Sequence, residues 1–279
     1  MFNHERYWND CAFLYRTLRH DYHITKDHIT LLMADGDNPA NDMLREGGIG
    51  FASTRTDLDG DGQPDLHLAA TRQDIDDTFR QLSVNLTADD QLFVFITDHG
   101  ERSSDDDVCL WLWGDEKLGP GALAAIIGQC SQGTVSILLG QCYAGAFVAP
   151  LLGQGRIVTA ACSANQLSWA CKDRPYDEFV YHWTCAVAQH DEQGQPVSSD
   201  TDGDGTVSMA EAFAYARQHD SRPESPTLSA LPADLATQWS LDSKRNDSQG
   251  IIPPTSPHHP PTVYDLQGRK VRGSNGENH

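Results

Sequence analysis

Apolar residues recur at helical spacing in five stretches of the chain. In residues 7–18 the apolar side chains lie at positions 7, 11, 14, 15 and 18. The second stretch begins after Thr71, whose hydroxyl can cap the first turn, three residues before Asp74. The others cover residues 119–127, which open with Gly119-Pro120 and so place a proline at a favourable first helical position, residues 175–189 and the stretch after residue 208. These patterns predict five helices.

Four short apolar runs predict buried strands, and they cover residues 29–34, 92–97, 135–139 and 156–161. Strands that alternate with helices predict an α/β fold with a mostly parallel central sheet. In such sheets the reactive groups lie at the carboxyl ends of the strands. Two of these runs end in residues suited to chemistry, T-D-H-G (97–100) and G-Q-C-Y-A-G (140–145).

The net charge of the chain limits the kinds of binding partner that are expected. The 279 residues are enough for one large domain with additions, and they include 40 Asp and Glu against 20 Lys and Arg, a formal net charge of −20. This charge argues against binding to nucleic-acid phosphates or to anionic lipid, and it suits an extracellular or calcium-rich setting. No apolar run reaches the roughly 18 residues of a membrane-spanning helix, and residues 1–20 do not have the pattern of a signal peptide.

The seven cysteines match no zinc motif in their spacing. Their odd number leaves at least one thiol free if the others pair, and the sequence does not determine the pairing. Most of them are expected to be small buried apolar groups.

Cys142 and His99 are the main candidates for chemistry. A nucleophilic thiol needs a base for its proton and N–H donors for the oxyanion. His99 can take the proton, and the backbone N–H groups of Gly100 and Cys142 can bind the oxyanion. Each residue alone would more often be structural. However, both follow apolar strands with a helix-sized segment between them, so a parallel sheet would bring them to one edge.

These residues resemble the caspase-fold cysteine peptidases, in particular the legumain family and its bacterial relatives. T-D-H-G resembles the legumain histidine motif, and C-Y-A-G-A-F (142–147) resembles the pattern around the nucleophile. The segments 70–75 and 158–168 are similar to the family's threonine-capped helix and to the segment beside its specificity pocket. The resemblance covers roughly residues 4–217. It implies a caspase-like three-layer fold and cleavage of a protein or peptide substrate through an acyl-enzyme, with no cofactor for catalysis.

The chain departs from the family pattern at three places. Gly140 stands where legumains have an acidic residue that reads the substrate, so a different substrate preference is expected. The resemblance places Gly140, Ser163 and Asn165 at the substrate-binding pocket. The family domain begins with a strand ahead of the segment that resembles residues 6–8, and this first strand is expected to be missing. Ala144 replaces a frequent serine, with little expected effect.

Residues 200–211, D-T-D-G-D-G-T-V-S-M-A-E, match the spacing of an EF-hand calcium loop. The predicted calcium ligands are Asp200, Asp202, Asp204, Thr206, Ser208 and Glu211. Gly205 would allow the turn and Val207 supplies the apolar eighth position. A structural calcium ion is therefore predicted, and the alternative is a solvated acidic turn.

A second acidic loop, residues 57–65, is a weaker calcium candidate. Its possible ligands are Asp57, Asp59, Asp61 and Asp65. Leu68 occupies the twelfth position, so the bidentate acid of an EF-hand is absent. The alternative is a hydrophilic loop.

The predicted domain organisation has three parts. Residues 1–219 form the peptidase domain, and residues 220–261, rich in Pro, Ser and Asp, form a linker. Residues 262–279 begin with T-V-Y-D-L-Q-G-R-K-V, which resembles the start of C-terminal sorting domains of bacterial type IX secretion. That resemblance implies a secreted, periplasmic or cell-surface protein, whereas a disordered end is the alternative.

The sequence thus predicts a calcium-stabilised cysteine endopeptidase. One alternative is a transamidase of the same fold, in which an amine instead of water intercepts the acyl-enzyme. The other is a catalytically inactive calcium-binding module that uses the fold for protein contacts. The sequence does not predict an oligomeric state.

Overall fold

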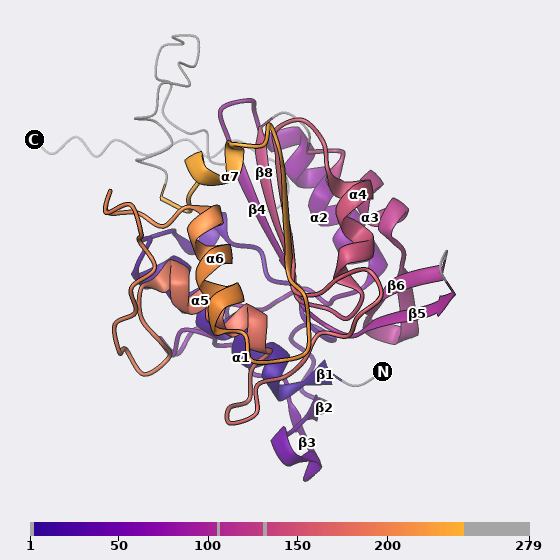
Figure 1. Cartoon of the computed structure of the whole chain (residues 1–279). Helices are drawn as coiled ribbons and strands as arrows, with labels where there is room; N and C mark the ends of the chain where they lie inside the picture. Colours follow the sequence, from indigo (N-terminus) through magenta and orange to yellow (C-terminus); the bar gives the residue numbers. More distant parts are fainter. Residues whose placement is uncertain (1–2, 105–106, 131–132, 243–279) are drawn as a thin grey trace, which may run out of the picture.

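The computed structural model describes residues 3–104, 107–130 and 133–242. Helices lie on both sides of a central sheet in this part of the chain (Figure 1). The predicted sorting-like tail, residues 262–279, and the part of the predicted linker beyond residue 242 lie outside the described residues.

Three of the predicted strands form the parallel part of the central sheet. These three are β4 (Gln91–Ile96), β8 (Thr134–Leu139) and β9 (Arg156–Ala160), and the fourth strand of the sheet is β10 (Thr227–Leu231). β8 pairs in parallel with β4 on one side and with β9 on the other, and β10 joins β9 antiparallel at the edge. The prediction of a mostly parallel sheet flanked by helices is confirmed.

Seven helices cover the two faces of this sheet within the described residues (Figure 1). On one face lie α2 (Arg72–Asn85), α3 (Pro120–Ile127) and α4 (Val148–Leu151). On the other lie α1 (Glu5–His20), α5 (Glu178–Ala188), α6 (Met209–His219) and α7 (Leu235–Gln238). Thr71 caps α2 by accepting a hydrogen bond from the Asp74 N–H, as predicted.

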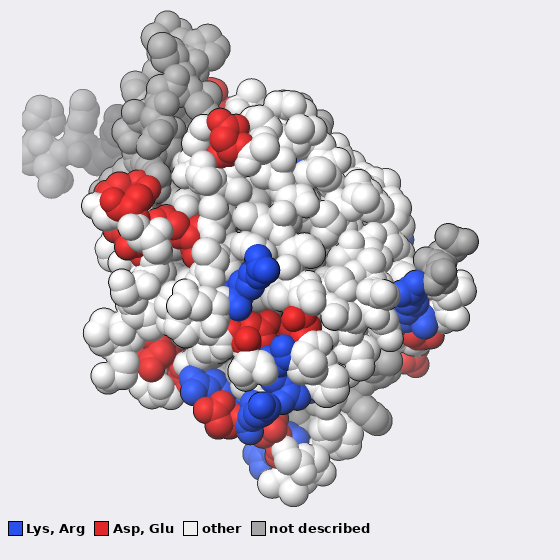
Figure 2. Space-filling model, in the orientation of Figure 1, with Lys and Arg blue, Asp and Glu red and all other residues white. Residues whose placement is uncertain are grey.

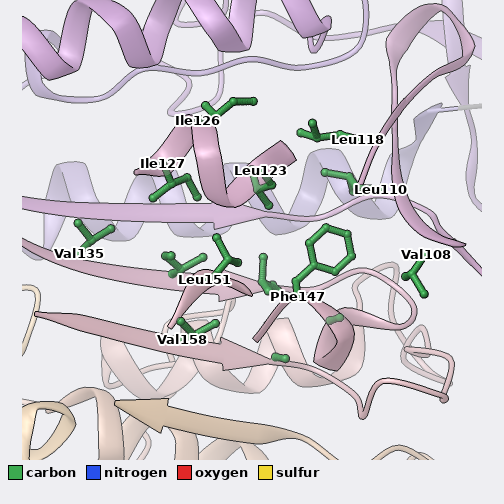
Figure 3. Packing of buried hydrophobic residues seen from close by; sticks show 14 of the residues in the cluster. Val108, Leu110, Leu118, Leu123, Ile126, Ile127, Val135, Phe147, Leu151 and Val158 are labelled. Carbon is green, nitrogen blue, oxygen red and sulfur yellow. The ribbon is translucent and has the colours of Figure 1, made fainter. Parts of the chain in front are cut away.

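The side chains of β8 alternate between two apolar cores. Val135, Ile137 and Leu139 pack with α3 and α4, while Leu138 packs with α5 and α6. Figure 3 shows the first core, in which Phe147 lies beside the sheet and is completely buried. Burial of each such side chain contributes about 1.5–3 kcal/mol, and burial on both faces explains why the predicted strands read as continuous apolar runs.

Two small sheets and several short helical turns complete the described chain. The first sheet consists of β1 (Asn3–His4), β2 (Asn41–Leu44) and β3 (Phe51–Ser53). The second consists of β5 (Gly100–Ser104), β6 (Asp107–Leu112) and β7 (Glu116–Leu118). The 3-10 turns are η1 (Lys26–His28), η2 (Glu46–Gly48), η3 (Trp113–Asp115) and η4 (Ala144–Phe147). The second sheet matters for the site because β5 follows directly after His99.

The predicted strand over residues 29–34 is wrong. Leu32 forms one isolated bridge with Leu68, and no ladder follows. The apolar side chains of this run pack against Trp8 and Met43 in a separate cluster. Packing of an irregular segment, and not strand pairing, therefore accounts for its apolar pattern. Within the described residues, the central sheet therefore ends at β4 on the side opposite β10.

The predicted linker is also wrong for residues 220–242. β10 lies in this segment and pairs with β9 over five residues. α7 follows, and Trp239 is only 4% exposed in the core beside α6. The folded domain therefore extends beyond the predicted boundary at residue 219.

Candidate active site

Cys142 lies just after β8, where the chain enters a tight turn. The Gly140 N–H donates to a carbonyl of β4 (2.7 Å), so strand pairing continues almost to the cysteine. Tyr143 then has φ of 60°, which is uncommon for a residue with a side chain, and its N–H donates to the Gln166 carbonyl (2.8 Å). The turn leaves the thiol half-buried, and it donates to the Ser168 carbonyl oxygen at 3.6 Å.

Gly100 packs directly against the backbone of Cys142. A Cβ atom at Gly100 would lie 1.9 Å from the Cys142 carbonyl oxygen, so only glycine fits this approach. The Gly100 N–H lowers the pKa of the Cys142 thiol and so favours the thiolate, although burial, the larger effect, raises this pKa. The structure thus brings together two residues that are 42 positions apart in the sequence.

The His99 ring packs against two aromatic neighbours from the start of the chain, His4 and Tyr7, which also contact each other. Its centroid is 5.2 Å from that of His4 and 5.4 Å from that of Tyr7, both in edge-to-face geometry. Burial raises the pKa of Tyr7 well above its usual value, and the Cys142 charge adds to this effect. Tyr7 therefore packs against the imidazole of His99. The sequence analysis missed His4 and Tyr7, because an apolar pattern at a helix start gives no signal for a distant strand end.

Burial keeps both candidate groups uncharged at neutral pH. It lowers the pKa of His99 to about 4, with a further contribution from the positive charge of Arg6. It also raises the pKa of the Cys142 thiol above the usual 9.0. A neutral imidazole can accept a proton, so the pair suits general-base transfer from a neutral thiol better than a resting ion pair.

A buried ion pair, not anticipated from the sequence, lies near the thiol. Arg6 Nε donates to Asp177 Oδ1 at 2.9 Å, and Asp177 also accepts the Thr97 hydroxyl at 3.1 Å. The positive charge of Arg6 lowers the pKa of both His99 and Cys142, after the larger effects of burial. Asp177 immediately precedes α5, where an acidic residue usually caps a helix, so the sequence gave no reason to assign it another contact.

The predicted substrate residues differ in their surroundings. Gly140 is buried, and a Cβ there would lie 2.7 Å from Val180 and 3.1 Å from Thr97, which speaks against direct contact between Gly140 and a substrate. Ser163 Oγ donates to Asn165 Oδ1 at 2.9 Å in the loop after β9. These two residues bond to one another, and their role in substrate binding stays a prediction.

The predicted calcium loop forms a tight turn before α6. The Asp200 carboxylate accepts the N–H groups of Gly203 (2.8 Å) and Gly205 (2.9 Å). Carboxylate oxygens of Asp200, Asp202 and Asp204 lie within 4.8 Å of one another. This set of hard oxygen donors fits the chemistry of calcium.

Glu211 closes this loop from the first turn of α6. Its carboxylate accepts the N–H of Thr201 and that of Ser208, each at 2.9 Å. The Ser208 hydroxyl oxygen in turn accepts the Glu211 N–H at 3.2 Å, which completes a capping box. Partial burial raises the pKa of Glu211, but these hydrogen bonds outweigh it and lower the pKa to about 2. Glu211 is therefore ionised and adjacent to the loop.

The second acidic loop has a cation of its own. Lys26 Nζ lies 2.8 Å from Asp61 and 2.6 Å from Asp65, and 3.8 Å from Asp59. The carboxylates of Asp57, Asp59 and Asp61 also cluster within 4.8 Å. A calcium ion here would compete with the lysine ammonium, so the geometry favours calcium at residues 200–211 over this loop.

Three comparisons relate the chain to known proteins. The sequence profile of the peptidase C13 family matches residues 3–219. A crystal structure of a protein from Geobacter sulfurreducens is 16% identical, with a TM-score of 0.41, over 57% of this chain and 73% of that one. Caspase-1 from Spodoptera frugiperda is 10% identical, with a TM-score of 0.38, over 59% of this chain and 69% of that one. No curated protein sequence matches the chain.

Proposed function

Because the chain belongs to the peptidase C13 family, a family of cysteine peptidases, we propose that it is an endopeptidase with Cys142 as nucleophile and His99 as general base. The family match agrees with the legumain-like resemblance of the sequence motifs. The substrate would be a protein or peptide, cleaved within its chain.

The first half of the reaction forms an acyl-enzyme. The Cys142 thiol turns from the Ser168 carbonyl and transfers its proton to His99, while the sulfur attacks the carbonyl carbon of the substrate. The N–H groups of Gly100 and Cys142 bind the resulting oxyanion. His99 then protonates the departing amine, the C–N bond breaks and a thioester remains.

The second half restores the thiol. Water gives a proton to His99 and attacks the thioester carbonyl, and the oxyanion is bound by the same N–H groups. As the C–S bond breaks, His99 returns the proton to Cys142 and the carboxylic acid product leaves. An amine in place of water would give transamidation through the same intermediate.

One observation carries this proposal: the contact between Gly100 and Cys142. A side chain at position 100 would collide with the backbone of the nucleophile, because its Cβ would lie 1.9 Å from the Cys142 carbonyl oxygen. Glycine at position 100 leaves its backbone N–H near the sulfur. This N–H can therefore stabilise the negative charge that develops on the oxygen of a substrate carbonyl attacked by the sulfur.

A peptidyl acyloxymethyl ketone probe tests the proposal. The folded wild-type protein is expected to be labelled on Cys142 and to hydrolyse peptides, and Cys142→Ala is expected to lose both activities. Cys162→Ala is the matched control, because Cys162 is fully buried and its loss should leave labelling intact. A folded wild-type protein that is neither labelled nor active would refute the endopeptidase proposal and favour the inactive binding module.

We also propose that calcium binds the loop of residues 200–211 and stabilises the domain. The clustered carboxylates of Asp200, Asp202 and Asp204, with ionised Glu211 beside them, support this proposal. The ion would hold the loop before α6 and would not take part in the thiol chemistry.

The surface charge agrees with a protein or peptide as the partner. On the face in Figure 2, Lys and Arg side chains lie in small groups beside Asp and Glu instead of forming one basic surface for phosphates. Among the described residues, no helix has both the length and the apolar character needed to cross a bilayer.

A further inference from the structure

A segment outside the helices and strands, residues 167–170, runs beside the candidate nucleophile, and Ala170 forms an isolated antiparallel bridge with Asp177. The Ser168 carbonyl oxygen lies 3.6 Å from Cys142 Sγ, and the side chains on either side of Ser168 are partly open to solvent. Leu167 is 43% exposed and Trp169 is 36% exposed. These two side chains are therefore available for contact with a peptide at the sulfur.

Trp169 is held from the side of the segment that faces away from Cys142. Its N–H donates to Glu224 Oε2 at 2.9 Å, and its carbonyl accepts the Glu178 N–H at 2.9 Å. The Arg222 guanidinium carbon lies 5.0 Å from the centre of the indole ring, a distance suited to a cation–π contact. The backbone and the ring of Trp169 thus both have partners within the protein.

These contacts determine where the neighbouring backbone groups point. Backbone N–H and C=O groups alternate in direction along an extended segment. Because those of Trp169 point toward Glu178 and Glu224, those of Ser168 point the other way, toward Cys142. The 3.6 Å contact between the Ser168 oxygen and the Cys142 sulfur agrees with this alternation.

Glu224 faces a second carboxyl group, that of Asp220. The two residues line one cavity of about 200 Å³ with Arg217, Ser225 and Pro226. Asp220 Oδ2 and Glu224 Oε1 are both buried, and neither has a hydrogen-bond partner of ordinary geometry among the described residues. A single proton shared between the two carboxyls would satisfy both oxygens.

The pKa of Glu224 agrees with a shared proton. Burial and the negative charge of Asp220 raise it to about 9, so the Glu224 carboxyl keeps its proton at neutral pH. Protonated Glu224 can donate to Asp220 while its other oxygen accepts the Trp169 N–H. A glutamine has the same donor and acceptor and would keep both contacts.

We propose that Arg222 and Glu224 are positioning residues that hold Trp169, so that segment 167–170 receives the peptide substrate beside Cys142. Neither residue touches the thiol or the imidazole in the contacts of the described chain. We call the contacts of Arg222 and Glu224 with Trp169 the clamp. Both residues lie beyond residue 219, where the family match ends. The inference rests on the proposed endopeptidase function.

Glu224→Ala and Glu224→Gln test the clamp together. Glu224→Ala is expected to lower the rate of labelling by a peptidyl ketone probe, and kcat/KM for a peptide, by about tenfold, through a raised KM. Labelling by iodoacetamide is expected to stay unchanged, because this small reagent needs the thiol and not the segment. Glu224→Gln is expected to retain wild-type rates.

Two further variants sharpen this comparison. Arg222→Met keeps the bulk of the side chain but loses its charge over the indole, and a fall of about twofold to fivefold in peptide labelling is expected. Asp90→Ala is the matched control, because Asp90 also accepts a backbone N–H, that of Thr87 at 2.7 Å, but it does so at the amino end of β4. Peptide labelling should be unchanged in this variant.

Hydrogen exchange of residues 167–170 measures the clamp without relying on activity. Exchange of the Trp169 amide is expected to rise in Glu224→Ala and not in Glu224→Gln or Asp90→Ala. Equal exchange in Glu224→Ala and wild type would overturn the inference even if the protein has no peptidase activity. If Glu224→Ala exchanges faster than the wild type but the wild type has no peptidase activity, the clamp stands and the endopeptidase proposal is refuted.

Discussion

Substitution of Gly100 by alanine perturbs the proposed site at one atom. The added Cβ would lie 1.9 Å from the Cys142 carbonyl oxygen, whereas ordinary contacts at such a position begin at 3.4 Å. The two backbones must therefore separate by about 1.5 Å, the difference between these distances. A displacement of this size removes the Gly100 N–H from an oxyanion at the sulfur, and loss of one such donor lowers kcat by about 10²–10³. The strain is expected to cost about 1–3 kcal/mol of stability.

The assay compares kcat, probe labelling and urea unfolding of Gly100→Ala with those of Gly121→Ala. Gly121 lies in the first turn of α3, and a Cβ there would meet no atom within 4 Å. Gly121→Ala should keep full activity and be stabilised by about 0.4–1 kcal/mol. If Gly100→Ala folds and retains a kcat close to wild type, the Gly100 N–H is not an oxyanion donor and the reasoning is refuted.

Three further predictions concern pH, calcium and the buried ion pair. Because burial lowers the pKa of His99 from 6.5 to about 4, protonation should abolish kcat/KM with a midpoint near pH 4, and a midpoint near 6.5 in the pH profile would contradict this. Calcium at about 100 times its Kd should raise the melting temperature by about 5–10 °C, and Asp200→Asn should remove most of this shift while Asp61→Asn preserves it. Arg6→Met should cost about 3–5 kcal/mol in urea unfolding because Asp177 is left buried and unpaired, and a cost under about 1 kcal/mol would mean that Asp177 is not charged.

The central sheet could be predicted because its strands are buried on both faces. β4, β8 and β9 each read as an apolar run, and the helices between them showed their amphipathic spacing. The same rule failed at residues 29–34, where an apolar run packs without a neighbouring strand. It also failed at β10, whose sequence T-L-S-A-L is only partly buried and lies among Pro and Ser residues that resemble a linker. Pairing with a strand more than 60 residues earlier, and not local composition, determines β10.

For the candidate site, too, local sequence patterns predict some residues, whereas contacts between distant parts of the chain bring in the others. His99, Gly100 and Cys142 could be proposed from the sequence because they follow strands whose direction was already predicted. The contact between Arg6 and Asp177 could not be predicted, because the two residues are 171 positions apart and neither follows a predicted strand. Localisation outside the cytoplasm and the sorting-like tail stay predictions.

The two acidic loops show why spacing alone cannot identify a metal site. In each, the first aspartate accepts the N–H groups of two glycines, Gly60 and Gly62 in one loop and Gly203 and Gly205 in the other. The loops therefore share a backbone scaffold that follows from their common D-x-D-G-D-G sequence. They differ in the charge that faces the carboxylates, since Lys26 comes from a turn more than 30 residues before the first loop. Repulsion among clustered carboxylates has to be relieved by some cation, and where the fold supplies an ammonium group the demand for calcium falls.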